Sequence, residues 1–145
     1  MTLDEFRRVV EEARAAHPQW FALPPDAAPE EDEVVVQSAQ LGVQLPTEYL
    51  DFLREFGGGD FAFLAVYSMD RASDLNIVTK NAVPWLERTD FVAVADNGAG
   101  DYYGFAVSGG RCGSEVLLLD HESGELRPTG DEDWFDFVVA KGLRQ

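Results

Sequence analysis

The side chains best suited to chemistry stand in one short segment, Asp-Asn-Gly-Ala-Gly-Asp, at residues 96–101. A calcium-binding loop needs alternating oxygen ligands and a late bidentate glutamate. Asp96, Asn97 and Asp101 lack that spacing, so an incidental cation site is only a weak alternative. The same residue types form tight turns, because their side chains bond to nearby backbone amides. We favour this turn-forming role and keep contact with a protein partner as the functional alternative.

Two glycine-rich stretches resemble nucleotide-binding motifs without matching them. In residues 98–104 the third glycine of a dinucleotide fingerprint comes one position late. A strand is expected after it, so no helix N-terminus would face a phosphate. The three glycines at 57–59 lack the Lys-Ser/Thr pair of a phosphate-binding loop. Neither stretch indicates a nucleotide site.

The chain contains few residues that act as nucleophiles or soft metal ligands. His17 and His121 are its only histidines and Cys112 its only cysteine, so a His-rich zinc site is excluded. His121 stands at a strand end, where we expect a turn residue bonded to backbone. Arg111 next to Cys112 would lower the pKa of the thiol, yet no Cys–His signature accompanies it. We predict no catalytic residue, no metal and no cofactor.

The N-terminal elements that must hold these residues are two helices and a loop. Thr2 and Glu5 predict a capping box at the start of the first helix. Residues 17–29 hold four of the seven prolines and predict a loop. Trp20 in that loop either folds back onto the domain, which we favour, or is exposed to a partner. The acidic run that contains Glu31 predicts the start of the second helix, because acids suit the positive end of a helix dipole.

Two features of the sequence around this second helix each allow two interpretations. Three consecutive valines at 34–36 favour a strand instead, but the Leu-Gly pair at 41–42 is typical of a helix end. The acidic run itself is either a solvated helix start, which we favour, or a surface that contacts a partner. Pro46 suits the first turn of a third helix, which Gly57 ends.

Strands dominate the second half of the chain. Apolar and turn residues predict one buried strand at 61–67, strands at 91–95, 101–107 and 115–120, and a short strand near Leu126. A helix over 131–142 closes the domain. Tyr102 and Tyr103 would point to opposite faces of their strand, so we assign only Tyr102 to partner contact. Helices followed by a sheet and a helix predict an α+β fold.

Composition restricts the class of protein. A chain of 145 residues suits one domain, which we place at 1–145. No apolar run has the roughly 20 residues of a membrane span, and the first residues show no secretory signal. A lone cysteine excludes an internal disulfide and fits a reducing compartment. We therefore expect a cytoplasmic protein without a membrane partner.

The net charge of −16 is the strongest compositional signal. Such a chain repels phosphate backbones, since nucleic-acid affinity comes largely from Lys and Arg contacts. The same charge would speed encounter with a basic protein. The alternative is that it serves only solubility. We predict a basic protein partner and no nucleic acid.

The order of four segments resembles the SUKH superfamily, the Smi/Knr-type domain of bacterial immunity proteins and of a fungal cell-wall regulator. They are residues 41–58, the turn at 96–101, the strand from Glu115 and the helix at Trp134. The likeness covers about residues 30–142 and leaves out the Pro-rich loop at 17–29. Its motif residues serve the scaffold: Leu45, Pro46, Tyr49, Gly57, Gly58, Gly98 and Gly100.

The resemblance implies a twisted, mostly antiparallel sheet flanked by helices. It also implies a function, because bacterial members commonly bind and silence a cognate toxin, often a nuclease. The chain would then be a non-enzymatic binding protein whose partner contacts we place at Asp96, Asn97, Asp101, Tyr102, Trp20 and Glu31. The alternative is a general interaction or regulatory module of the Smi/Knr type. A small hydrolase is the least favoured hypothesis.

Overall fold

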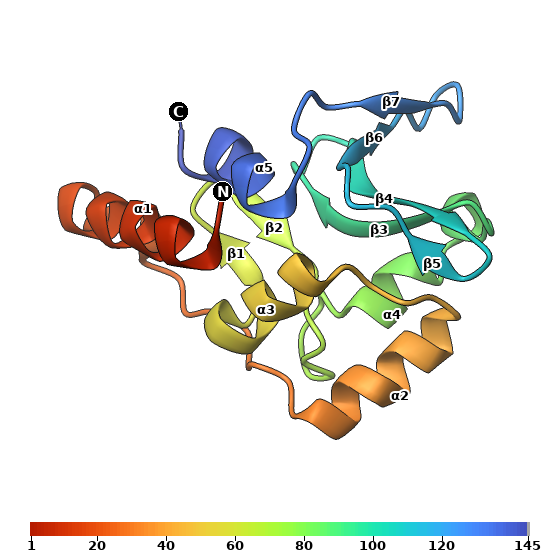
Figure 1. Cartoon of the computed structure of the whole chain (residues 1–145), viewed down its shortest axis with the longest axis horizontal. Helices are drawn as coiled ribbons and strands as arrows, with labels where there is room; N and C mark the ends of the chain where they lie inside the picture. The colour runs from red at the N-terminus through yellow and green to blue at the C-terminus, as the bar shows by residue number, and fades with distance from the viewer. Residues whose placement is uncertain (145) are drawn as a thin grey trace.

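A computed structural model describes residues 1–144 of the protein (Figure 1). These residues contain five α-helices, two short 3₁₀ helices and seven strands. The helices are α1 (Leu3–Ala16), η1 (Pro18–Phe21), α2 (Glu31–Leu41), α3 (Thr47–Phe56), α4 (Ile77–Asn81), η2 (Pro84–Leu86) and α5 (Trp134–Gly142). The strands are β1 (Gly59–Phe61), β2 (Leu64–Val66), β3 (Phe91–Asp96), β4 (Tyr102–Ser108), β5 (Arg111–Cys112), β6 (Leu117–Leu119) and β7 (Leu126–Pro128). This order confirms the predicted α+β fold.

The strands form one antiparallel sheet in the order β1-β2-β3-β4-β6-β7, with β5 paired to β4. Its register decides which turns are neighbours. Asp96 lies opposite Ala65 on one side and Tyr102 on the other. Tyr102 in turn lies opposite Leu119. The turns after β1, β3 and β6 therefore all lie at the same end of the sheet.

The predicted single strand at 61–67 is wrong, because the chain turns back within it. β1 and β2 pair as a hairpin in which Phe61 lies opposite Leu64. Ala62 adopts a positive φ of 53° in the tight turn between them, and Phe63 donates its amide to the Gly142 carbonyl at 3.0 Å. The turn contains neither glycine nor proline, so the hydrophobic pattern runs through it unbroken.

The helix starts and ends follow the predicted caps with two differences. Thr2 and Glu5 form the capping box of α1, and Gly42 ends α2 with a left-handed backbone. Pro46, however, is the N-cap of α3, so the helix begins one residue later than predicted. The closing helix α5 likewise begins later than the predicted 131, at Trp134, because Asp133 is its N-cap.

The Pro-rich segment 17–29 is a loop except for η1, where it turns into a short 3₁₀ helix. It is tied to the end of α3, since the Asp26 amide donates to the Gly58 carbonyl at 2.9 Å. Gly57 has a φ of +80°, and a β-carbon on it would lie 1.9 Å from the Asp26 carbonyl oxygen. Glycine is therefore required at 57 for two reasons, its backbone conformation and the closeness of the loop.

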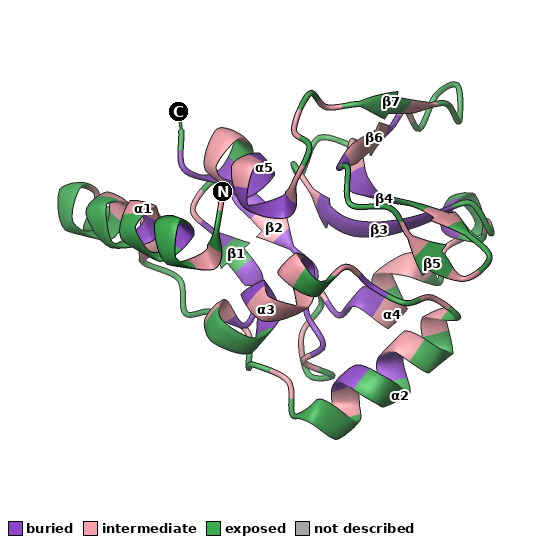
Figure 2. Ribbon diagram, viewed as in Figure 1, coloured by how far each residue is buried: buried purple, intermediate pink, exposed green. Residues whose placement is uncertain are grey.

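Aromatic side chains from helices and sheet form the centre of the core. Phe6 of α1 is fully buried and contacts Phe52 of α3, Phe61 of β1 and Phe135 of α5, with ring centroids 4.9 to 6.3 Å apart. Figure 2 shows that α1, α3, α5 and the strands all carry buried residues. These contacts hold α1 against α3, β1 and α5.

Candidate functional site: turns and aromatic residues at one end of the sheet

The β3–β4 turn is closed by its own side chains. Asp96 accepts a hydrogen bond from the Gly98 amide at 2.9 Å, and Asn97 accepts one from the Ala99 amide at 2.9 Å. The Asn97 side-chain amide donates to the Asp101 carboxylate at 2.9 Å. The turn-forming role that we favoured for these three residues is therefore present. Contact of this turn with a partner stays a prediction.

Asp96 also accepts from inside the protein. The Tyr67 hydroxyl donates to its second carboxylate oxygen at 2.7 Å, and Lys80 lies 4.0 Å from the same oxygen. Burial, followed by the hydrogen bond to Asp96, raises the pKa of Tyr67 far above its usual value, so the phenol stays protonated and donates. The side chain of Asp96 is only 16% exposed. It is thus mainly a support for the turn, whereas Asn97 is exposed; Asp101, like Asp96, is half-buried.

Tyr102, the residue after this turn, lies beside two aromatic residues that sequence reasoning did not place in the site. Trp85 of η2 donates its indole N–H to the Tyr102 hydroxyl at 3.0 Å. Tyr102, Trp85, Gly100 and His121 line a surface pocket of about 330 Å³. As predicted, the neighbouring Tyr103 points the other way and is buried against Phe137. Tyr103 thus belongs to the core, whereas Tyr102 lines the surface pocket.

His121 lies in a turn, as expected, but its side chain does not bond to backbone. Within residues 1–144, its side chain has no hydrogen-bond partner in the protein, although we expected one with backbone. Its ring instead packs on Gly100, where an added β-carbon would lie 3.2 Å from the imidazole Cε1. Trp85 and His121 meet Tyr102 only because β4 pairs with β6 and η2 lies nearby. The only signals in the sequence were two aromatic rings that lie outside the predicted strands and helices.

Trp20 lies in η1 and folds back in part, as we favoured. Its indole stacks on His17 with ring centroids 3.9 Å apart, and its edge meets Phe63 at 5.0 Å. Phe63 stands in the β1–β2 turn and is 45% exposed, and Leu23 of the same Pro-rich segment is 61% exposed. Since Phe63 lies at the turn end of the sheet defined above, Trp20 belongs to that end too.

Glu31 lies apart from the other candidates. It is in the first turn of α2, at the bottom of the view in Figure 1, whereas β6 and β7 are at the top. Its carboxylate pairs with Arg54 of α3 at 2.7 Å, and this hydrogen bond lowers the pKa of Glu31. Arg54 also pairs with Asp51 at 3.1 Å. Glu31 therefore joins two helices while remaining 72% exposed.

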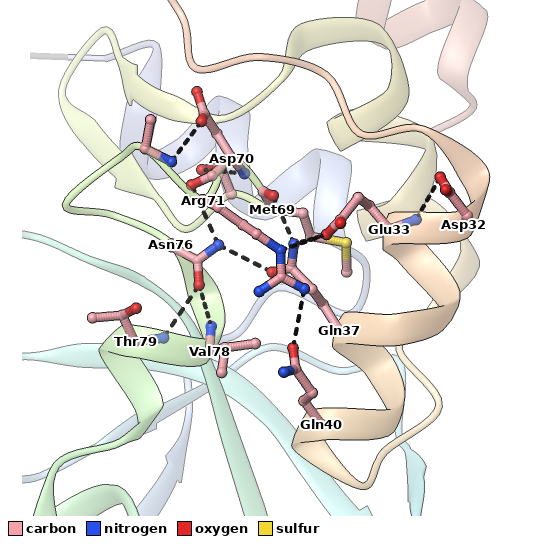
Figure 3. A network of polar contacts seen from close by, with 12 residues as sticks. Asp32, Glu33, Gln37, Gln40, Met69, Asp70, Arg71, Asn76, Val78 and Thr79 are labelled. Atoms are coloured by element: carbon pink, nitrogen blue, oxygen red, sulfur yellow. Dashed lines mark hydrogen bonds and ion pairs between the residues drawn. The ribbon is translucent and has the colours of Figure 1, made fainter.

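A buried polar network holds α2 against the segment before α4 (Figure 3). Gln37 is fully buried, donates to the Met69 carbonyl at 2.7 Å and to Glu33 at 2.6 Å, and accepts from Asn76. Arg71 donates to the same Glu33 carboxylate at 3.0 Å. The acidic start of α2 is thus fixed in place by contacts one turn further along the helix.

The remaining reactive group is Cys112 on β5. Burial raises the pKa of its thiol to about 11, opposite to the lowering that Arg111 beside it suggested.

In the described part of the chain, no group of three or more His, Cys, Asp or Glu side chains is placed to hold a metal ion. Nor does any helix within residues 1–144 have the length and apolar character needed to cross a membrane.

One comparison with known proteins gives a match. A family model, SUKH_6, described as SMI1-KNR4 cell-wall, matches residues 32–138. This range runs from the first turn of α2 into α5 and leaves out α1 and the Pro-rich segment. No curated protein and no solved structure gives a significant match.

Proposed function

The chain belongs to this SMI1-KNR4 family, and we propose that it is a non-enzymatic binding protein that neutralises a cognate protein toxin. The toxin is basic, with a nuclease as the favoured class, and it is inactivated by occlusion of its active surface. The observation that carries the proposal is the family match together with a net charge of −16.

The distribution of charge supports a basic partner. Within residues 1–144, six of the eleven basic residues lie within 4.0 Å of a carboxylate: Arg7, Arg54, Arg71, Lys80, Arg88 and Arg127. Their charges are therefore locally compensated. The excess of acids over bases remains to act on a partner at long range, where it raises the rate of association with a positively charged protein.

Exposed aromatic residues supply the second requirement for tight binding. Charge steers the encounter, but slow dissociation needs a few well-packed anchors, which in protein interfaces are most often Trp, Tyr and Arg. Trp85 and Phe63 are about half exposed and lie at or near the turn end of the sheet. The same end carries Asp101 and Tyr102, so anchors and acids are neighbours.

Co-expression tests the proposal. The gene beside the one for this chain is expressed from an inducible promoter, with and without the chain, and growth and nucleic-acid integrity are followed. We expect the neighbouring product to be toxic alone and harmless with the chain, and the two to co-purify. A toxic neighbour that the chain neither rescues nor binds would overturn the proposal.

The family description, which refers to the cell wall, favours a second candidate, a general interaction module of the Smi/Knr type. Such a module would bind several partners with moderate affinity. Affinity purification of the tagged chain from its own cells separates the two: a single stoichiometric partner supports the toxin-binding function, and several unrelated partners support the module.

A further inference from the structure

Three aromatic rings from three separate segments meet at one surface pocket. Trp85 comes from η2, Tyr102 from the start of β4 and His121 from the turn after β6, and with Gly100 they line about 330 Å³. Trp85 is 54% exposed. A large aromatic side chain in this position adds little to the core, because more than half of its surface stays in water.

Specific contacts hold the rings in place. The indole N–H of Trp85 is bonded to the Tyr102 hydroxyl at 3.0 Å, which fixes the two rings relative to each other. His121 rests on Gly100, whose φ of +96° and missing β-carbon leave room for the imidazole. Trp85 and Tyr102 are therefore held together at one side of this open surface pocket, and His121 packs on Gly100 at the other.

The charged neighbours indicate which ligand suits this pocket. Asp101 precedes Tyr102 in the chain and Glu122 follows His121, whereas Asp120, on the other side of His121, is already paired with Arg127 at 3.2 Å. Aromatic faces attract cations, Trp most strongly, and carboxylates around them strengthen that attraction. A nucleotide base would also stack on these rings, but its phosphate would meet the acidic surface.

We propose that the Trp85–Tyr102–His121 pocket receives an arginine side chain of the basic protein partner. Arginine is favoured over lysine because its planar guanidinium stacks on aromatic rings and is less strongly hydrated than an ammonium group. Only the source of the arginine rests on the proposed function. The preference of the pocket for a guanidinium is a property of the chain and is tested without the partner.

The test is a titration followed by NMR. The three tryptophans, at 20, 85 and 134, give three indole N–H signals, of which only that of Trp85 belongs to the pocket. The probe is N-acetyl-arginine amide, and N-acetyl-citrulline amide is the matched control of the same shape without charge. We expect the Trp85 signal to shift with saturation, with citrulline at least about threefold weaker. The other two indole signals should stay in place.

Variants complete the test. Trp85→Leu should abolish the arginine-dependent shifts of the Gly100 and His121 backbone amides, whereas Trp20→Leu, which changes another partly buried tryptophan, should leave them intact. A Trp85 signal that does not move, or equal binding of arginine and citrulline, would overturn the proposal. Lysine amide binding as well as arginine amide would overturn the guanidinium preference.

Binding measurements with the protein partner then test this inference separately from the proposed function. If the neighbouring toxin binds, Trp85→Leu should weaken it by about 30-fold, as for an interface hot spot. Guanidinium binding with no toxin partner would leave the pocket assigned and the toxin-binding function rejected. Toxin binding that Trp85→Leu does not weaken would support the toxin-binding function and reject the pocket as the site of the partner's arginine.

Discussion

The side-chain amide of Asn76 donates a hydrogen bond to the side-chain oxygen of Gln37 at 3.0 Å, and both residues are almost completely buried. Gln37 belongs to α2, and Asn76 caps α4, where its own oxygen accepts from the amides of Val78 and Thr79. This one contact therefore links a helix cap to a neighbouring helix (Figure 3). It fixes the position of α2 and with it the acidic residues of its first turn.

Replacement of Gln37 by alanine should destabilise the protein strongly. The change leaves the buried amide of Asn76 and the Met69 carbonyl each with one partner fewer, and it opens a cavity. An unsatisfied buried polar group costs about 1–3 kcal/mol, so we expect a loss of at least about 2 kcal/mol in the free energy of unfolding. Urea denaturation followed by circular dichroism measures it.

Gln40→Ala is the matched control, because Gln40 is on the same helix but exposed, and its one contact, from Arg71, is long at 3.4 Å. Its effect should stay within about 0.5 kcal/mol. Equal effects of the two variants would show that the network does not stabilise the fold. Gln37→Ala combined with Asn76→Ala should cost less than the sum of the single changes, because they share one hydrogen bond.

A second prediction concerns two glycines that end helices. Gly57 and Gly42 both have positive φ, at 80° and 71°, so alanine is strained at either position. Only at Gly57 would the added β-carbon also meet a backbone oxygen, that of Asp26 at 1.9 Å, whereas nothing lies within 4 Å at Gly42. We expect Gly42→Ala to cost about 1–2 kcal/mol.

Gly57→Ala should cost clearly more, because the Pro-rich loop must move away and lose its bond to Gly58. Thermal unfolding and limited proteolysis of both variants check this. Early cleavage between residues 17 and 29 in Gly57→Ala alone is the expected pattern. Similar melting temperatures for the two would mean that the loop adapts at no cost.

The local signals in the sequence were sufficient for most helices and for the hairpins of the second half. Caps such as Thr2 with Glu5, and the glycine at 42, act within one or two turns of their own helix, so they can be recognised without the fold. The β1–β2 turn was missed for a related reason. Ala62 and Phe63 are apolar, and nothing in their types marks a reversal of the chain.

Only part of the candidate site could be predicted from the sequence. The roles of Asp96 and Asn97 in their turn are local and follow from residue type. The pocket of Trp85, Tyr102 and His121 depends on the pairing of β4 with β6, which joins residues far apart in the sequence. The burial of Gln37 likewise depends on the position of Asn76, 39 residues away. Contacts of this kind follow from topology, and a single sequence does not contain a local signal for them.

The third prediction is a loss of stability at alkaline pH that depends on Cys112. Burial raises the pKa of its thiol from 9.0 to about 11 in the folded protein. The stabilisation is therefore fully present below about pH 9 and is lost as the pH rises toward 11, because the unfolded chain ionises first. Urea midpoints of the protein and of Cys112→Ala at pH 8 and pH 10 measure it, and the decrease should be smaller in the variant.

The reactivity of the same thiol provides an independent check. At pH 8 it should react with iodoacetamide much more slowly than the urea-unfolded chain, since the thiolate is the reactive form. Fast alkylation of the folded protein at that pH would contradict the raised pKa.

The last prediction distinguishes two residues of the β3–β4 turn: Asp96, which stabilises the fold, and Asp101, which contributes to partner binding. Asp96 accepts from the Tyr67 hydroxyl at 2.7 Å and from the Gly98 amide at 2.9 Å, whereas Asp101 accepts from the exposed side chain of Asn97. Asp96→Ala leaves the hydroxyl of a buried tyrosine without its acceptor, so it should lower the free energy of unfolding by about 2 kcal/mol. Asp101→Ala should lower it by less than about 1 kcal/mol.

Binding should follow the opposite order. Asp101 stands next to the pocket residue Tyr102, so its loss removes a charge that steers a basic partner. We expect Asp101→Ala to slow association about two- to fivefold in low salt, with the difference shrinking at 0.5 M salt because exposed charges are screened. Asp96→Ala, measured at a temperature where it stays folded, should change association less. Surface plasmon resonance against the co-purified partner gives both rates, and a salt-independent defect in Asp101→Ala would instead indicate a direct buried contact.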